Sequence, residues 1–506
     1  MKREILKYQR NTSYKRSNME GYPLDWQHQP DVYKKYPVQE HVSLEEVTLV
    51  NRDNIFDLLK KGPDHKEIKT ISLHTLSKIL LLGFNITAVA SFQGKNFYYR
   101  SMPSAGALYP NEIYLAAYNV SGLKHGIYHF MIKERMLVPL RYGNYKGYIE
   151  SSGSFGKDEK RETLAASFFI SGIFFRTSWK YRKRGYRYVL NDTGHLVESL
   201  YHASLFEGIP PLVSYDFDDD RMNKLLGFDS EKEACFALLH LPGQSMPDIP
   251  AEDINHVTDL SEELMSASSV SEREVDYCEI SDIHRESKGV VKNPEGIRNY
   301  DVTSGIHAVE WIDIPCPPVE KSILSYPETI FKRRSKRNFV PDRMSADDFH
   351  LLLHLLCDNF HHSLKDTTAG ISPAIGFLLD NIEGYENGYY LLDLGGRKAG
   401  LVNEGRLTSL SATVCLNQKW LENAALHFLF MGDLDYIEKE FGSRGYRYLM
   451  IGAGRLAQII YSGATALGLG CCGIGALFDY EAQQMLDLLD NIFLLYLVAA
   501  GPVKKA

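Results

Sequence analysis

Segments with apolar residues at helical spacing alternate along the chain with short, nearly continuous apolar runs. The helical spacing predicts an opening helix and a long later helix in each half of the chain, and the apolar runs predict buried strands. The predicted helices cover 72–82 and 345–356 and start near Arg184 and Arg444. The predicted strands cover 112–118, 165–172, 388–392 and 424–432. Because strands and helices are interspersed, we expect a mixed α+β fold.

The two halves of the chain repeat each other. Arg184-Gly-Tyr-Arg-Tyr188 recurs as Arg444-Gly-Tyr-Arg-Tyr448, and nine of 25 positions from 184 to 208 are identical at an offset of 260. Upstream, the apolar run at 165–172 aligns with the segment that starts at Ala424, and 119–130 resembles 381–392 at a similar offset. Self-similarity of this kind indicates a duplication, so both halves should share one fold.

The length and composition divide the chain into two folded halves. A chain of 506 residues is too long for one ordinary core and suits two domains of about 200 to 250 residues. Between the halves lies a polar, acidic stretch whose composition suits a linker or strap. The expected parts are a leading segment at 1–65, a first module at 66–247, a linker at 248–322 and a second module at 323–506.

The net charge and the cysteine content indicate which classes of partner and which cellular compartment to expect. The net charge of -8 gives no reason to expect nucleic acid or an anionic membrane, so a small or peptide-derived partner is expected. The seven cysteines form neither a CxxC pair nor a His/Cys cluster, which predicts a reduced, cytoplasmic protein without a metal site. The N-terminus lacks the apolar run of a signal peptide, and the apolar stretch at 164–175 is too short to span a bilayer.

Two segments of the second half could bind an anionic, flat ligand. Residues 333–337 (RRSKR) place four cations and a hydroxyl within five positions, which can surround a phosphate, although a solvated basic turn is equally expected. Residues 467–475 contain glycines at 468, 470, 473 and 475, which let backbone approach a ring closely, although such a turn needs no ligand. The first half has PPLVS at 210–214 instead and has lost the glycines.

Other candidates lie in the first half and at the C-terminus. The loop at 100–110 (RSMPSAGALYP) is rich in small residues and can present hydroxyl and amide groups, or can be an ordinary turn. Lys180 and Tyr181 could transfer protons if Lys180 were partly buried, although a surface lysine beside a packed aromatic is more common. Their counterparts in the second half are Glu440 and Phe441. Lys504 could reach a phosphate or belong to a solvated basic tail.

These motifs together resemble the nitroreductase superfamily and, more narrowly, the SagB/ThcOx-type azoline dehydrogenases. The resemblance rests on RSMPSAGALYPNEIYL, GLKHGIYHF, FFRTSWKYRKRGYRYVLNDTGH and ALGLGCCGIGALFDYEAQQML. It implies two nitroreductase-like modules that form an intrachain pseudo-dimer with FMN at their interface. The implied flavin-binding residues are Arg333, Arg334, Ser335, Arg337 and Lys504 near the phosphate, Cys472, Gly473, Ile474 and Gly475 against the ring, and Pro103, Ser104, Ala105 and Gly106 from the other module.

The resemblance also implies a mechanism and a count of sites. Azoline dehydrogenases use a Lys-Tyr pair in this context, so Lys180 is expected to be the general base, with Tyr181 beside it. Only one complete site can be assembled, because the first half lacks the glycine turn and the basic segment. The alternatives are an NAD(P)H-dependent nitro or quinone reductase and a flavin-free scaffold. Further pairing of whole chains stays open.

Overall fold

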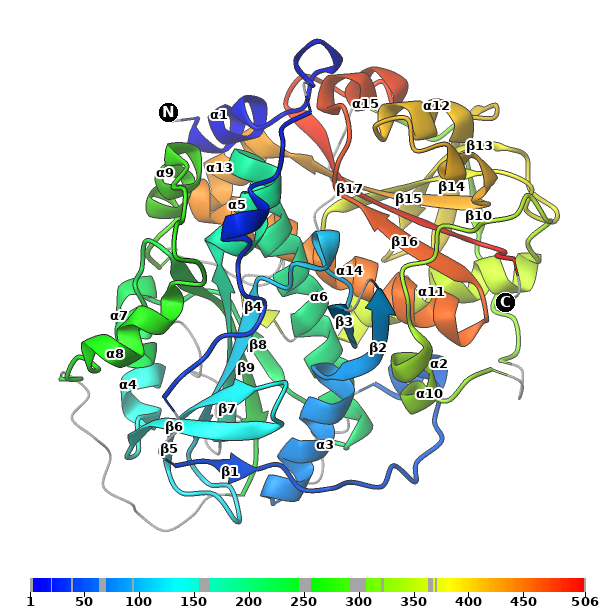
Figure 1. Cartoon of the computed structure of the whole chain (residues 1–506). Helices are drawn as coiled ribbons and strands as arrows, with labels where there is room; N and C mark the ends of the chain where they lie inside the picture. The colour runs from blue at the N-terminus through cyan, green and yellow to red at the C-terminus, as the bar shows by residue number, and fades with distance from the viewer. Residues whose placement is uncertain are drawn as a thin grey trace.

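The computed structural model describes residues 3–19, 21–37, 40–62, 70–92, 95–153, 164–244, 256–290, 306–319, 323–362, 367–368 and 371–504. It contains two modules, each with one mostly antiparallel sheet and helices packed on it (Figure 1). The expected α+β fold and its tandem arrangement are therefore confirmed. None of the helices in these ranges combines the length and apolar character needed to cross a membrane.

The two main sheets have the same strand order. In the first module the order is β1-β6-β5-β4-β7-β9-β8, and in the second it is β10-β14-β13-β12-β15-β17-β16. Short β11 (Thr367–Thr368) of the second half pairs in parallel with β8 and extends the first sheet. The first-module strands are β1 (Val42–Ser43), β4 (Asn111–Ala117), β5 (Gly126–Met131), β6 (Met136–Tyr142), β7 (Leu164–Ile173), β8 (Leu212–Ser214) and β9 (Glu233–Pro242). The second-module strands are β10 (Glu310–Asp313), β12 (Ala374–Leu379), β13 (Gly388–Asp393), β14 (Lys398–Glu404), β15 (Leu426–Asp433), β16 (Gly470–Ile474) and β17 (Ile492–Gly501).

The helices and a separate hairpin complete each module. The predicted opening helices are α3 (Leu73–Gly83) and α11 (Ala346–His362), and the predicted long helices are α6 (Gly185–Phe206) and α14 (Gly445–Ala466). Strands β2 (Ile86–Phe92) and β3 (Lys95–Arg100) form a hairpin of their own. The other α-helices are α1 (Glu4–Asn11), α2 (Ile55–Lys61), α4 (Lys146–Glu150), α5 (Phe174–Tyr181), α7 (Asp219–Leu226), α8 (Glu262–Met265), α9 (Cys278–Glu286), α10 (Tyr326–Lys332), α12 (Thr408–Val414), α13 (Leu434–Phe441) and α15 (Asp479–Met485).

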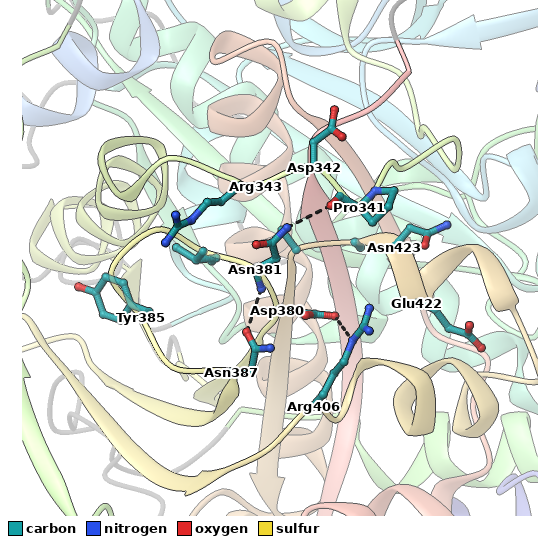
Figure 2. Close-up of a pocket in the computed structure, with 13 residues that line it drawn as sticks. Pro341, Asp342, Arg343, Asp380, Asn381, Tyr385, Asn387, Arg406, Glu422 and Asn423 are labelled. Atoms are coloured by element: carbon teal, nitrogen blue, oxygen red, sulfur yellow. Dashed lines mark hydrogen bonds and ion pairs between the residues drawn. The ribbon is translucent and has the colours of Figure 1, made fainter.

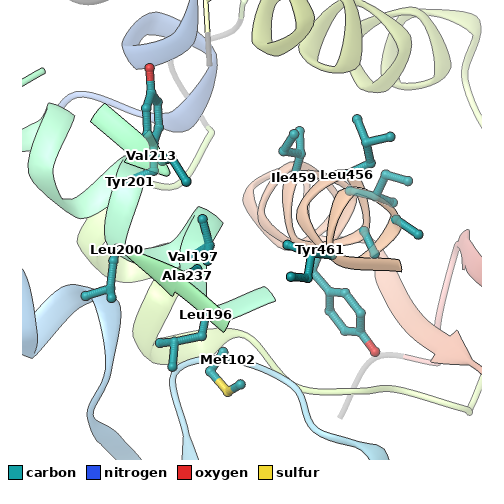
Figure 3. Packing of buried hydrophobic residues seen from close by; sticks show 14 of the residues in the cluster. Met102, Leu196, Val197, Leu200, Tyr201, Val213, Ala237, Leu456, Ile459 and Tyr461 are labelled. Atoms are coloured by element: carbon teal, nitrogen blue, oxygen red, sulfur yellow. The ribbon is translucent and has the colours of Figure 1, made fainter. Parts of the chain in front are cut away.

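The two long helices α6 and α14 pack against each other at equivalent glycines. A Cβ atom added to Gly194 would lie 2.1 Å from the carbonyl oxygen of Ile451, and one added to Gly454 would lie 2.1 Å from that of Asn191. Only glycine permits backbones to approach so closely, which explains why this glycine is kept in both halves. Around the crossing, apolar side chains of both helices, such as Leu196 and Ile459, belong to one buried cluster (Figure 3).

The repeated RGYRY motif joins the two modules by reciprocal ion pairs. Arg184 and Arg187 of the first module each contact a carboxylate oxygen of Asp479 at 2.7 Å. In the mirrored arrangement, Arg444 and Arg447 pair with Asp219. All of these side chains are buried. Although burial alone raises the pKa of each aspartate, the neighbouring guanidinium groups hold both pKa values below the ordinary range. The motif is therefore repeated because it stabilises the junction.

Part of the predicted linker is packed into this junction. Helix α9 lies within 248–322, and its Ile280 and Ile283 are buried. The carbonyl oxygen of His284 accepts a hydrogen bond from Arg447 at 3.0 Å, as that of Gln9 in α1 accepts one from Arg187 at 2.6 Å. The leading segment and the linker thus supply equivalent partners to the two motifs. Helix α9 keeps polar residues such as Asp282 and Arg285 because these lie on its exposed side. The domain boundaries themselves stay a prediction.

Candidate active site

A cavity of about 740 Å³ lies at the junction of the two modules. Both modules contribute to its wall, so it exists only because the modules pack together. The predicted residues that line it are Pro103, Ser104, Ala105, Gly106, Lys180 and Tyr181 from the first half and Arg333, Arg334, Ser335, Arg337, Cys472, Gly473, Ile474 and Gly475 from the second. Lys504 lies outside this lining, and its backbone N–H donates to the carbonyl oxygen of Asn338 at 3.0 Å.

The basic segment presents one buried and two more accessible guanidinium groups to the cavity. Arg333 is buried and donates to the carbonyl oxygens of Ser101 (2.7 Å) and Arg100 (2.9 Å). Its Nη1 atom has no hydrogen-bond partner among the described residues, and burial lowers the pKa of this guanidinium. A buried charge without a counter-ion is unfavourable, so this end of the cavity suits an anion.

The glycine-rich strand β16 and the turn after it lie close to two tyrosines. A Cβ atom added to Gly473 would lie 2.0 Å from the hydroxyl of Tyr496, and one added to Gly475 would lie 2.5 Å from the ring of Tyr188. Arg184 donates to the carbonyl oxygen of Gly475 at 2.9 Å. The first module therefore holds the glycine turn of the second module in place, and larger side chains there would displace the tyrosines that line the cavity.

Lys180 and Tyr181 converge on the loop that carries Gly106. Gly106 has a φ of 65°, and a Cβ atom added there would lie 2.8 Å from the hydroxyl of Tyr181 and 3.2 Å from Nζ of Lys180. Lys180 lines the cavity and is exposed, yet partial desolvation of its ammonium and the charge of Arg337 lower its pKa. Burial and the nearby Tyr188 and Asp192 raise the pKa of Tyr181. Lys180 is therefore the better proton acceptor of the two.

The sequence interpretation missed two polar residues of α6 that line the cavity, Asn191 and Asp192. Asp192 is buried, accepts a hydrogen bond from the Ser104 hydroxyl and accepts another from the N–H of Ala105 at 3.3 Å. Burial raises the pKa of this carboxyl to about 7, although the two hydrogen bonds oppose the rise. Their counterparts in the second half are Ile451 and Gly452. The replacement of this polar pair by Ile and Gly in the repeated helix was the signal that could have found them.

Replacing Asp192 with Asn is expected to make the free energy of unfolding less dependent on pH. The folded-state pKa is about 7 and the ordinary value 3.8. As pH rises through this window the unfolded state therefore loses its proton first, and the wild type loses stability. Asn cannot ionise but can still accept from Ser104, so the variant should gain about 1–3 kcal/mol at about pH 8 and almost nothing at about pH 4. Urea unfolding at both pH values measures the free energy of unfolding of the variant and of the wild type. The same difference between the two proteins at both pH values would contradict the prediction.

The equivalent position on the other side of the junction carries a large side chain, that of Tyr215. Tyr215 occupies the position that corresponds to Gly475 of the second module. Arg444 donates to the carbonyl oxygen of Tyr215 at 2.7 Å, and Arg184 donates in the same way to the carbonyl oxygen of Gly475. The Tyr215 hydroxyl accepts from buried Arg455 at 3.2 Å, and Arg455 pairs with Glu198 at 2.6 Å. These side chains therefore pair with one another beside the position that corresponds to Gly475.

Comparison with known proteins shows similarity to nitroreductases. A model of the nitroreductase family matches residues 391–501. Over these residues the second module is similar to the nitroreductase family. A protein named as a nitroreductase in Methanocaldococcus jannaschii is 26% identical over 188 residues, which are 36% of this chain and 94% of that protein. The microcin B17-processing protein McbC of Escherichia coli is 26% identical over 181 residues, which are 35% of this chain and 64% of McbC.

A solved structure shows the same fold over the full length. The crystal structure of a protein named as a nitroreductase from Anabaena variabilis aligns with 100% of both chains at a TM-score of 0.79 and 21% sequence identity. The fold of the whole chain, with its two modules, therefore occurs in another protein as well.

The leading segment of the chain lies against the helix that carries the Lys-Tyr pair. The ring of Trp26 packs edge-on against Trp179 of α5 at 5.3 Å between centroids, and the indole N–H of Trp179 donates to the carbonyl oxygen of Asp25 at 2.8 Å. The guanidinium of Arg182, directly after α5, lies 3.3 Å from the ring centroid of Tyr22. This segment therefore borders the residues next to Lys180 and Tyr181.

A second, smaller hollow of about 380 Å³ lies within the second module (Figure 2). Some of its polar groups pair with one another: Asp380 accepts from Arg406 at 2.7 Å, and Asn381 donates to the carbonyl oxygen of Pro341 at 3.1 Å. None of the residues predicted to bind flavin or to transfer protons lines it. The junction cavity is the better candidate for the active site.

Proposed function

We propose that the chain is an FMN-dependent dehydrogenase of the SagB/ThcOx type with one composite site. The observation that carries this proposal is the junction cavity, where the proton-transfer pair of one module meets the basic segment and glycine turn of the other. The two modules act as an intrachain pseudo-dimer whose second site carries the large side chain of Tyr215 at the position that corresponds to Gly475. The seven free cysteines suit a reducing compartment, so we place the protein in the cytoplasm.

The lining residues fit FMN. Arg333 has a buried donor without a partner, and Arg334 and Arg337 add positive charge beside it, which matches a phosphate. Gly473 and Gly475 leave room for a flat ring, and the loop of residues 103–106 approaches from the other module. Bound FMN would accept a hydride from the substrate. The protein would supply the position of the substrate and the transfer of its proton.

Lys180 is the proposed general base. Its lowered pKa increases the fraction of neutral amine at physiological pH, and only the neutral amine can take a proton from the substrate. Tyr181 has a raised pKa and stays protonated, so its hydroxyl can donate a hydrogen bond that orients the substrate. Because the hydroxyl and the amine both approach Gly106, substrate bound there would contact both groups.

The substrate class is a heterocycle or a peptide-derived molecule. The similarity to McbC, which is named as a protein that processes microcin B17, supports a peptide-derived substrate. The similarity to a protein named as a nitroreductase supports the alternative, an NAD(P)H-dependent reductase. The source of electrons separates the two, because the proposed dehydrogenase reduces its flavin with an organic substrate and without a nicotinamide.

The first test is the visible spectrum of the purified protein. We expect the wild type to bind FMN and to be yellow, and a variant with Arg333→Ala and Arg337→Ala to be folded but colourless. The matched control is Arg343→Ala, which removes an exposed arginine of the smaller hollow and should stay yellow. A wild type that cannot be reconstituted with FMN would overturn the enzyme proposal and favour the scaffold.

A further inference from the structure

The side-chain amide of Asn191 is buried, and none of the described residues forms a hydrogen bond with it. The residue is 2% exposed, and its side chain lines the junction cavity. Neither its Oδ1 nor its Nδ2 atom has a hydrogen-bond partner among the described residues. Burying an amide without hydrogen bonds is unfavourable, so a group of this kind in a cavity wall indicates a ligand that supplies both bonds.

The repeat provides an internal comparison for this position. The counterpart of Asn191 in α14 is Ile451, and that of Asp192 is Gly452. An apolar residue is therefore compatible with the same place on the same helix crossing, and the packing of α6 on α14 does not require an amide. The carbonyl oxygen of Asn191 lies against Gly454 at the crossing, which holds its backbone in place. The polar side chain is present only in the half that faces the cavity.

The chemistry of the amide selects one edge of the proposed ligand. A carboxamide offers one acceptor and two donors side by side. The isoalloxazine ring carries the complementary sequence of groups, a carbonyl, an N–H and a second carbonyl, only at its imide edge, whereas its dimethylbenzene edge would leave Asn191 unsatisfied. We infer that Asn191 recognises the imide edge of the flavin and thereby sets which way the ring lies in the cavity. This inference rests on the proposed FMN site.

The test compares the affinity of Asn191→Leu and of the wild type for FMN. Each flavin-free protein is titrated with FMN, and flavin fluorescence reports the binding. Leu branches at Cγ as Asn does but has neither polar group, so we expect the dissociation constant to rise about tenfold. The control is Ser204→Ala on the same helix, because the Ser204 hydroxyl donates only to Leu200 within α6. If Asn191→Leu does not fold, Asn191→Ile, which copies the second module, replaces it.

A second ligand separates recognition from general damage to the site. FMN methylated at N3 lacks the imide N–H, so we expect the wild type to bind it about tenfold more weakly than FMN and Asn191→Leu to bind both ligands equally. Equal FMN affinity in the wild type and in Asn191→Leu would overturn the role of Asn191 and leave the proposed function standing. A wild type that binds neither flavin would overturn both.

Discussion

Replacing Lys180 with Met is expected to slow the reduction of bound flavin by an azoline-containing peptide about a hundredfold or more. The loss follows because Met cannot accept the proton that must leave the substrate, and general base catalysis contributes roughly a factor of 10²–10⁴. The wild-type rate should rise with pH until Lys180 is neutral, since its pKa is lowered but only the unprotonated amine reacts. The variant should lose this dependence. Anaerobic stopped-flow measurement of flavin absorbance gives both rates.

The matched control for Lys180 is Lys183→Met. Lys183 follows three residues later and pairs with Glu279 at 3.1 Å rather than lining the cavity. We expect this variant to reduce its flavin at the wild-type rate and Lys180→Met to retain wild-type affinity for FMN. A Lys180 variant that reduces its flavin as fast as Lys183→Met would contradict the assignment of the base. Reduction by NADPH alone, without peptide, would favour the reductase alternative.

Replacing Asp479 with Ala is expected to lower the free energy of unfolding by about 3–5 kcal/mol, because Arg184 and Arg187 would remain buried without their counter-ion. Asp219→Ala should destabilise the protein by a similar amount, because it leaves Arg444 and Arg447 buried without their counter-ion. Urea unfolding of the two variants measures these losses. If both cost less than about 1 kcal/mol, the reciprocal ion pairs would not stabilise the junction.

The two aspartate variants should differ in their affinity for FMN. Arg184 donates to the carbonyl oxygen of Gly475 in the cavity wall, so losing its partner Asp479 should loosen the glycine turn and weaken FMN binding. Arg444 holds the equivalent carbonyl of Tyr215, which has a large side chain at the position that corresponds to Gly475. Asp219→Ala should therefore leave the affinity for FMN nearly unchanged. Equal weakening in both variants would contradict the proposal of a single site.

The stability that these ion pairs contribute should depend on pH with a defined sign. The pKa of Asp479 and that of Asp219 are held below the ordinary value of 3.8 in the folded protein. Their contribution is therefore complete above the pKa of the unfolded chain and is lost as pH falls below about 4. Asp192 behaves in the opposite way, because its folded-state pKa is raised.

Several elements were predictable from local sequence because their signals are local. The apolar run at 165–172 became β7, and the helical spacing from Arg184 became α6. The identity of RGYRY at two places predicted one fold for both halves, but not its role. Its arginines bind Asp479 and Asp219, which lie in the opposite module, and no spacing within one half indicates such a pair.

The sequence by itself determined the duplication, the α+β fold and a set of candidate residues, because repeats, periodicity and motif composition are properties of short segments. Only the tertiary structure decided which candidates meet. It brought Lys180 and Gly106 to the glycine turn at 473–475, excluded Lys504 from the cavity lining and added Asn191 and Asp192. The reason is physical: a cavity between modules depends on how α6 and α14 cross. The burial of Asn191, its lack of hydrogen-bond partners among the described residues and the raised pKa of Asp192 all result from that packing.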